Sequence, residues 1–153
     1  MENYMKVIVF TLKEQRFGVN VQQVLSIEKL QEITKVPRTS DFIKGVINLR
    51  GETIPIIDLK ERLHITETEM TNENRILIVN VEDVQVGLIV DSATDVIDIA
   101  TELVEPAPKM IGGVHEVYLK GVAKLENELL ILLDLEQIID LEETTEVKEV
   151  VEE

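Results

Sequence analysis

Short blocks of apolar residues alternate with polar turns along the chain, and this pattern predicts pairs of β-strands. Residues 6–12 and 16–21 are apolar runs separated by a few polar residues, which is typical of an antiparallel hairpin. Apolar positions 21, 24, 25 and 27 within residues 21–29 predict one helical turn that leads into a strand. The hairpin pattern recurs three more times, over 45–57, 76–90 and 121–135.

Two short helices are predicted directly after two of these hairpins. Asp58-Leu59-Lys60-Glu61 matches a capping box, in which the aspartate accepts from backbone N–H groups and the glutamate reaches back to the cap. Asp134-Leu135-Glu136-Gln137 has the same pattern. The first helix is expected to end near Leu63.

The hairpins belong to an internal repeat. Aligning Gly18 with Gly87 also aligns their flanking apolar residues, at an offset of 69 residues. The segment GVAKLENELLILLDL (121–135) repeats GVINLRGETIPIIDL (45–59) at an offset of 76, so an insertion is expected within 105–116. Such a repeat predicts two similar β-lobes, over approximately 6–65 and 75–140, that can exchange strands. Short, evenly spaced strands favour closed antiparallel barrels, which have no free edges.

The composition narrows the class of protein. A chain of 153 residues suits one domain or two small lobes with a shared core, and with 3% aromatic residues that core is aliphatic. The formal net charge of −15 disfavours nucleic acid and anionic membranes as partners. Residues 142–153 hold six Glu and one Lys and are expected to form a flexible acidic tail. With no membrane-length apolar run, no signal peptide and no cysteine, a cytoplasmic protein without disulfides is expected.

Candidate chemistry is sparse. His64 and His115 have no base or metal ligand at helical spacing, and no hydrolase, nucleotide-binding or zinc-site motif is present. Asp58 and Asp134 could form a carboxylate pair for acid–base catalysis, but helix capping explains both their positions and their repetition. The acidic clusters lack the spacing of a calcium-binding loop. These observations predict a protein without catalysis, metal or cofactor that binds other proteins.

Differences between the two repeat segments indicate candidate contact residues. The first segment has Arg50-Gly51 at a turn where the second has Glu126-Asn127, so the hairpin itself does not require the arginine. Arg50 could bond a partner, or it could form an internal salt bridge or a clamp between the lobes. A loose alignment places Val21 and Val24 opposite Ser92 and Asp95. The two valines could therefore form an exposed contact surface, or they could belong to the core.

Four segments resemble the CheW family, the coupling proteins of bacterial chemotaxis. The resemblance covers about residues 5–140 and rests on FIKGVINLRGETIPIIDL (42–59), FGVNVQQVLSIEK (17–29), VGLIVDSATDVIDI (86–99) and YLKGVAKLENELLILLDLEQII (118–139). It implies an all-β fold of two five-stranded SH3-like barrel lobes within a single domain over residues 1–141. It also implies a non-catalytic adaptor between the cytoplasmic tips of methyl-accepting chemoreceptors and the regulatory domain of the histidine kinase CheA. Such adaptors lie in receptor arrays at the inner face of the membrane.

The resemblance also implies the site residues. Matching positions would place in the receptor contact Gly45, Arg50, Gly51, Ile76, Leu77, Gly87 and Ser26. Matching positions for the kinase contact are Ile8, Val21 and Val24. Many family members carry an acidic residue where this chain has Ser26. Either Glu28 substitutes for that carboxylate or the receptor contact is weaker.

Two alternatives are also compatible with the sequence. One is a β-barrel protein that binds a small ligand or nucleic acid, which would need basic grooves and stacking aromatic residues. The other is an adaptor for a related kinase array that does not serve flagellar taxis.

Overall fold

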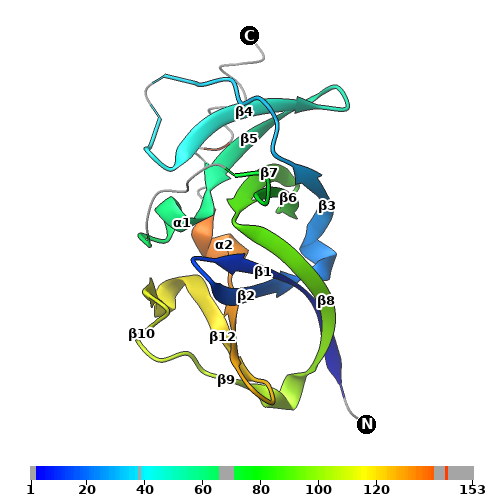
Figure 1. Ribbon diagram of the computed structural model, residues 1–153, viewed down its shortest axis with the longest axis vertical. Helices are drawn as coiled ribbons and strands as arrows, with labels where there is room; N and C mark the ends of the chain where they lie inside the picture. Colours follow the sequence, from blue (N-terminus) through cyan, green and yellow to red (C-terminus); the bar gives the residue numbers. More distant parts are fainter. Residues whose placement is uncertain (1–2, 38, 66–70, 140–143, 145–153) are drawn as a thin grey trace.

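The structure is a computed structural model that describes residues 3–37, 39–65, 71–139 and 144. It is an all-β protein in which two lobes are stacked along the long axis (Figure 1). We call them the upper and lower lobes, as they lie in Figure 1. The acidic segment 142–153 lies outside the described residues, apart from Thr144.

Each lobe is built on one sheet. The upper sheet has the order β3-β6-β7-β5-β4 and the lower sheet the order β8-β1-β2-β13-β12-β9. The upper strands are β3 (Val24–Lys29), β4 (Ile43–Leu49), β5 (Glu52–Asp58), β6 (Arg75–Val81) and β7 (Val84–Val90). The lower strands are β1 (Tyr4–Leu12), β2 (Gln15–Asn20), β8 (Ser92–Ala100), β9 (Val104–Glu105), β12 (Leu119–Lys124) and β13 (Leu129–Leu133).

The remaining elements are short. A small hairpin joins β10 (Met110–Ile111) to β11 (Val114–His115), inside the segment 105–116 where the repeat predicts an insertion. The helices are η1 (Val21–Gln23), α1 (Leu59–Arg62), η2 (Thr101–Leu103), η3 (Glu116–Tyr118) and α2 (Leu135–Ile138). Both α-helices lie between the two lobes (Figure 1).

All four predicted hairpins are present, and so is the helical turn that leads into β3. The two sheets repeat one strand order, because β3-β6-β7-β5-β4 corresponds to β8-β1-β2-β13-β12. In each sheet a parallel pair joins strands from opposite halves of the chain, β5 with β7 and β13 with β2. The halves therefore contribute their first hairpins to each other's sheets, and the molecule has an internal pseudo-twofold symmetry.

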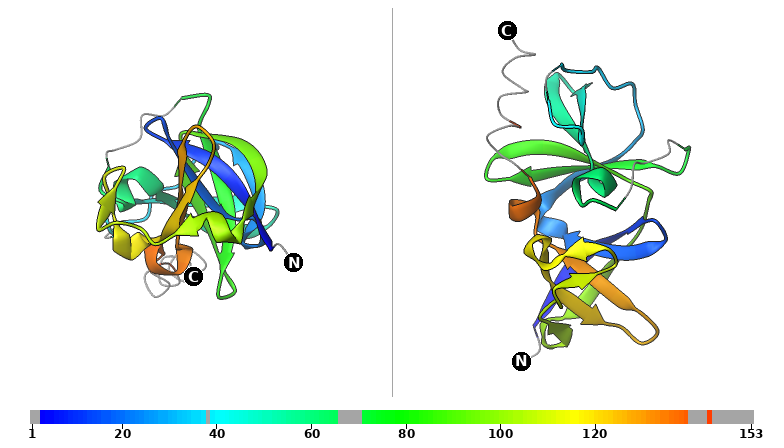
Figure 2. Two further views of the ribbon diagram at one scale, coloured as in Figure 1. Left: turned by 90° about the horizontal axis from the view of Figure 1, so that it is seen from below. Right: turned by 90° about the vertical axis from the view of Figure 1, so that its left-hand side faces the viewer.

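The all-β architecture with two similar lobes is confirmed, but the backbone ladders do not close into barrels. In the upper lobe, the segment between β3 and β4 carries Pro37 and makes a single bridge, from Thr34 to Val46. In the lower lobe, β9 is two residues long and is followed by Pro106. Proline cannot donate to a ladder, so both lobes remain curled, open sheets (Figure 2).

Three apolar cores result from strands that are buried on both faces. One core lies inside the upper lobe and includes Ile54 and Ile76, and another lies inside the lower lobe and includes Val7 and Leu130. The largest core joins the lobes and includes the stacked rings of Phe10 and Phe17. Because side chains alternate across a strand, neighbouring residues of β1 and β6 serve two different cores. This explains why their sequences are continuously apolar.

The two helix caps differ. Asp134 Oδ1 accepts from the backbone N–H of Glu136 at 3.1 Å, as the capping pattern predicts. The Asp58 side chain makes no such cap bond, so this part of the prediction is wrong. Asp58 is fully buried, and its backbone N–H donates to the carbonyl oxygen of Phe42 at 2.8 Å. Burial beneath the start of β4 therefore fixes the position of Asp58.

Candidate functional site

Arg50 occupies the tip of the β4–β5 hairpin. Leu49 pairs with Glu52, which leaves Arg50 and Gly51 as a two-residue turn with φ angles of 51° and 85°. Two positive φ values define the turn type that suits the twist of a tight hairpin. The other tight hairpins do the same with Lys13-Glu14 and Glu82-Asp83. The turn geometry therefore does not explain the choice of arginine.

The Arg50 side chain extends from the turn over the surface of the upper lobe. It is 71% exposed, and its Nη2 lies 3.6 Å from Oε2 of Glu28, whose side chain is 17% exposed. Glu28 belongs to β3, so this ion pair stays within one lobe. The clamp between lobes that the sequence left open for Arg50 is formed instead by Arg62, whose Nε donates to the carbonyl of Ile138.

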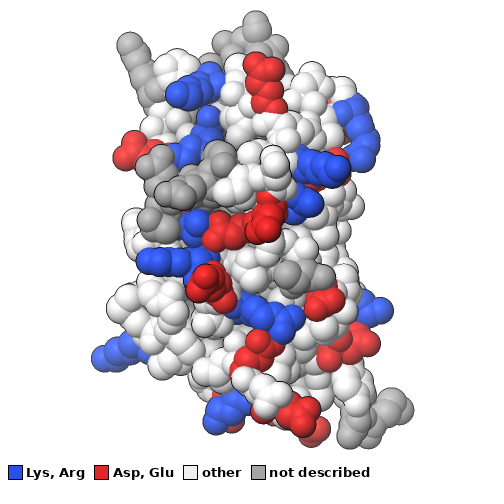
Figure 3. Space-filling view, viewed as in Figure 1, with Lys and Arg blue, Asp and Glu red and all other residues white. Residues whose placement is uncertain are grey.

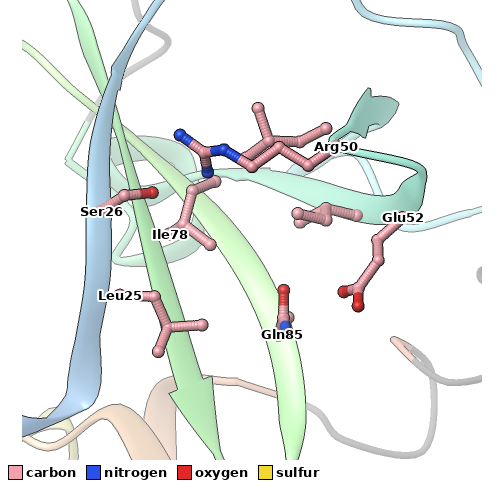
Figure 4. A pocket seen from close by; sticks show the side chains of 8 residues that line it. Leu25, Ser26, Arg50, Glu52, Ile78 and Gln85 are labelled. Carbon is pink, nitrogen blue, oxygen red and sulfur yellow. The ribbon is translucent and has the colours of Figure 1, made fainter.

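A hollow of about 230 Å³ opens beside Arg50, between β3, the β4–β5 hairpin and the β6–β7 hairpin (Figure 4). We call it the Arg50 hollow. Its apolar walls are Leu25, Leu49, Ile54 and Ile78, and its polar groups are Ser26, Arg50, Glu52 and Gln85.

Two polar groups of the Arg50 hollow, those of Ser26 and Glu52, lack intramolecular partners among the described residues. Ser26 Oγ is buried and makes no hydrogen bond. In the described part of the chain Glu52 forms no ion pair, and Figure 4 shows its carboxylate turned toward Gln85. Buried polar atoms are usually satisfied. A partly apolar hollow beside an exposed turn, with an unsatisfied hydroxyl of β3 in its wall, is therefore a candidate contact for a partner.

The structure brings three of the predicted receptor-contact residues together, namely Ser26, Arg50 and Gly51. Ile76 and Leu77 are fully buried, the first in the upper core and the second in the core between lobes. They do not line an open groove, because neighbouring residues of β6 point into cores on opposite faces of the sheet.

The two remaining glycines of the predicted receptor set are also internal. A Cβ on Gly45 would lie 2.0 Å from the carbonyl oxygen of Thr34, and the φ of Gly45 is +137°. A Cβ on Gly87 would lie 2.5 Å from Cδ1 of Ile56. Both positions need glycine for close packing, so their role in the structure is to support the hairpin rather than to offer a surface.

The predicted kinase-contact residues lie near the junction of the lobes. Ile8 is buried in β1, and Val21 and Val24 are half-buried and pack against the core between lobes. Strand pairing gives an offset of 69 residues here too, which aligns Val21 with Val90 and Val24 with Ala93. The loose alignment with Ser92 and Asp95 was two residues out of register, so the contrast between apolar and polar positions is wrong.

Sequence reasoning missed Leu25, Glu52 and Gln85, which complete the Arg50 hollow. The signal was available in the repeat. At the correct offsets, Ser26 corresponds to Asp95, Gln85 to Arg16 and Glu52 to Glu128. These correspondences show that two of the three positions are charged in the lower lobe and neutral in the upper lobe, a difference that is visible in the sequence.

Other site types find no support among the described residues. That part of the chain contains no group of three His, Asp or Glu side chains placed to hold a metal ion. None of its helices is long and apolar enough to cross a bilayer. His115 has a structural role, since its Nδ1 accepts from the backbone N–H of Val117 at 3.1 Å. On the face shown in Figure 3, acidic and basic side chains are interspersed.

Comparisons with known proteins agree on one family. Residues 6–143 match the sequence model of the CheW-like domain. The chain is 42% identical over 137 residues to the chemotaxis protein CheW of Bacillus subtilis (strain 168), covering 90% of this chain and 88% of that protein. It is 33% identical over 138 residues to chemotaxis protein CheW of Thermotoga maritima, covering 88% and 87%.

A solved structure gives the same result. The crystal structure of the scaffolding protein TtCheW from Thermoanaerobacter tengcongensis matches with a TM-score of 0.83 and 35% sequence identity. The match covers 91% of this chain and 90% of TtCheW. The family match, the sequence relatives and the shared fold all span nearly the whole length, and the chain therefore belongs to the CheW-like domain family.

Proposed function

We propose that this chain is a non-catalytic adaptor of a chemotaxis array. It would link the cytoplasmic tips of chemoreceptors to the histidine kinase CheA at the inner face of the membrane. Its relatives are named chemotaxis proteins, and TtCheW is described as a scaffolding protein. The large apolar core that joins the lobes supports such a role, because a scaffold must hold two partners in a fixed geometry.

One observation carries the receptor side of this proposal. Arg50 projects from a hairpin tip, largely exposed, at the rim of a hollow with apolar walls and an unsatisfied Ser26 hydroxyl. A receptor tip is a helical hairpin, and helices bind by placing apolar side chains in a groove while arginines fix the rim. The Arg50 hollow offers both kinds of contact.

The kinase side is proposed at η1. Val21 and Val24 are half-buried there, and η1 contacts both β1 and β6. Ile8 lies beneath this surface in β1 and supports it without being exposed. A partner at η1 would sit on the junction of the lobes, on residues of β3 rather than on the Arg50 turn.

The test is a binding titration of the purified chain against a receptor cytoplasmic fragment and, separately, against CheA. Arg50→Ala should weaken receptor binding at least fivefold, since arginine hot spots are worth about 1–2 kcal/mol or more. The same variant should leave the melting temperature nearly unchanged, because an exposed ion pair contributes about 0–1 kcal/mol.

Two variants serve as controls. Lys124→Ala removes a cation at the end of β12, the corresponding strand of the lower lobe, and should leave receptor binding intact. Val21→Asp should weaken CheA binding and leave receptor binding intact. If the wild-type chain binds neither the receptor fragment nor CheA, the family resemblance gives the fold alone and the adaptor proposal fails.

A further inference from the structure

The lower lobe shows what occupies the position of the Arg50 hollow. There, Arg16 of β2 lies between two carboxylates. Its Nη2 is 3.6 Å from Oδ2 of Asp95 on β8, and its Nη1 makes a close ion pair with Glu128 beside the β12–β13 turn. The Arg16 side chain is therefore held across the same strands that surround the hollow in the upper lobe.

The strand pairings fix the correspondence between the two positions. Ser26 pairs with Ile78 directly after a bulge, and Asp95 pairs with Val9 next to a bulge at the same point of the other ladder. Leu49 pairs with Glu52. Leu125 and Glu128 exchange the matching backbone hydrogen bonds.

The upper lobe has one of the two carboxylates and an uncharged side chain at the position of the cation. Glu52 stands where the lower lobe has Glu128, but Gln85 stands where it has Arg16 and Ser26 where it has Asp95. The Arg50 guanidinium does not take the vacant place, since it reaches Glu28 and lies over Ile78 on the Ser26 side of the hollow (Figure 4). Glu52 and Gln85 face each other on the opposite side (Figure 4).

We propose that the Arg50 hollow receives the side chain of an arginine from a partner protein, in the place that Arg16 fills in the lower lobe. Its guanidinium would pair with Glu52 and donate to the side-chain oxygen of Gln85. Its aliphatic stem would lie against Leu25, Ile54 and Ile78, as long cationic side chains cover apolar surfaces. Arginine suits the site better than lysine because its planar fork can serve several acceptors at once.

Charge complementarity supports this occupant. The chain carries a formal net charge of −15, so a basic group on a partner is attracted to it over a distance. Glu28 neutralises Arg50, which leaves Glu52 as the uncompensated charge of the hollow. That the arginine belongs to a receptor tip rests on the proposed function. That the hollow binds arginine rests on the contacts alone.

Three variants make the proposal testable within this chain. Gln85→Arg restores in the upper lobe the arrangement of Arg16 and should fill the hollow. Glu52→Gln removes the acceptor charge without adding bulk, and so guards against a Gln85→Arg protein that fails to fold. Arg16→Gln is the reciprocal change and should open a second arginine site between Asp95 and Glu128.

The first measurement is an NMR titration of the 15N-labelled chain with N-acetyl-arginine methylamide, with the uncharged citrulline analogue as control. The wild type should show saturable shifts at the backbone amides of Ser26, Glu52 and Gln85. In Gln85→Arg and Glu52→Gln the dissociation constant for the arginine compound should rise at least fivefold. The citrulline compound should bind the wild type more weakly than the arginine compound by the same factor. Arg16→Gln should add a second set of shifts at Asp95 and Glu128. Absence of saturable shifts in the folded wild type, or equal shifts in Gln85→Arg, would overturn the proposal.

A second titration with the receptor cytoplasmic fragment separates the two proposals. If the wild type binds the fragment and both Gln85→Arg and Glu52→Gln, the latter without added bulk, bind it at least fivefold more weakly, the arginine comes from the receptor. If the arginine compound binds but the fragment does not bind the wild type, the adaptor proposal fails and the arginine site stands. Equal binding of the fragment to wild type and Gln85→Arg would refute the receptor as the source.

Discussion

Arg62 Nε donates a hydrogen bond of 2.7 Å to the backbone carbonyl oxygen of Ile138, 76 residues further along the chain. The two residues occupy corresponding positions in the internal repeat, at the last residue of α1 and the last residue of α2. The Arg62 guanidinium lies 5.0 Å from the ring centre of Phe42 and 5.1 Å from that of Tyr118, which also correspond to each other. Arg62 therefore sits close to the pseudo-twofold axis and clamps the lobes together.

The first prediction concerns the stability of the lobe interface. Arg62→Ala should lower the free energy of unfolding by about 2–3 kcal/mol, because it leaves a half-buried carbonyl unpaired and removes two cation–π contacts. Arg62 Nη1 also donates to the hydroxyl of Tyr118 at 3.1 Å. Arg62→Lys should therefore recover only part of this loss, since lysine has no planar fork to serve the carbonyl and the hydroxyl together. Urea denaturation followed by circular dichroism measures both.

The comparison that decides the point is with Arg50→Ala, which removes the same side chain from a mostly exposed position. Arg50→Ala should change the free energy of unfolding by less than about 0.5 kcal/mol. If Arg50→Ala destabilises the fold as much as Arg62→Ala, the assignment of the clamp to Arg62 is wrong.

The second prediction concerns a buried ion pair. Lys60 Nζ lies 2.7 Å from Oδ1 of Asp91, with the two side chains 8% and 26% exposed. Oδ2 of Asp91 accepts from the backbone N–H of Lys13 at 2.7 Å, so Asp91 connects α1 to the β1–β2 turn of the lower lobe. Lys60→Met should destabilise the protein by about 1–3 kcal/mol, because it leaves a partly buried carboxylate without its cation.

A double-mutant cycle isolates the interaction itself. Lys60→Met combined with Asp91→Asn should give a coupling energy of about 1–2 kcal/mol. The pair of Lys124 and Glu105, 3.3 Å apart and more than half exposed on both sides, should give less than about 0.5 kcal/mol in the same cycle. Equal coupling in the two pairs would show that burial contributes nothing to the Lys60–Asp91 interaction.

The sequence predicts the hairpins and short helices of this fold well, because turns and helix starts depend on a few neighbouring residues, although the predicted cap bond of Asp58 is absent. The repeat was visible for the same reason, since Gly18 and Gly87 mark equivalent strands. The exchange of hairpins between halves depends on the parallel pairs β2–β13 and β5–β7, and no local pattern records which strands pair over such distances.

The candidate site was predictable in part. Arg50 stood out because the corresponding turn lacks an arginine, but burial of the other predicted positions is a property of packing. The sequence alone does not distinguish Ile76 and Leu77 from apolar residues that stay exposed. Their burial follows from the sheet, which places them between two cores. The role of Arg62 was hidden for the same reason, since its partner is a backbone carbonyl of a distant helix.

The third prediction separates backbone strain from steric overlap at two glycines of one hairpin. Gly45 and Gly51 both have positive φ, but a Cβ on Gly45 would meet the Thr34 carbonyl at 2.0 Å and one on Gly51 would meet nothing within 4 Å. Gly51→Ala should cost about 1 kcal/mol through strain alone. Gly45→Ala should cost well above that, because β4 must separate from the Thr34 bridge. Thermal melts of the two variants test the difference.

The last prediction compares the effect of an added Cβ at two glycines that the pseudo-symmetry makes equivalent. Gly87 and Gly18 are equivalent, but a Cβ on Gly87 would lie 2.5 Å from Ile56 Cδ1, whereas one on Gly18 would lie 3.2 Å from Leu132 Cδ2. Gly87→Ala should therefore destabilise the protein by about 1–3 kcal/mol through overpacking, and Gly18→Ala by less than about 1 kcal/mol. Ile56→Val removes the crowding Cδ1, so the double variant Gly87→Ala/Ile56→Val should be more stable than the sum of the single changes implies. Strictly additive changes in chemical denaturation would mean that the second close contact of the added Cβ, 2.8 Å to Cγ2 of Ile76, restricts the Gly87 position and not Ile56.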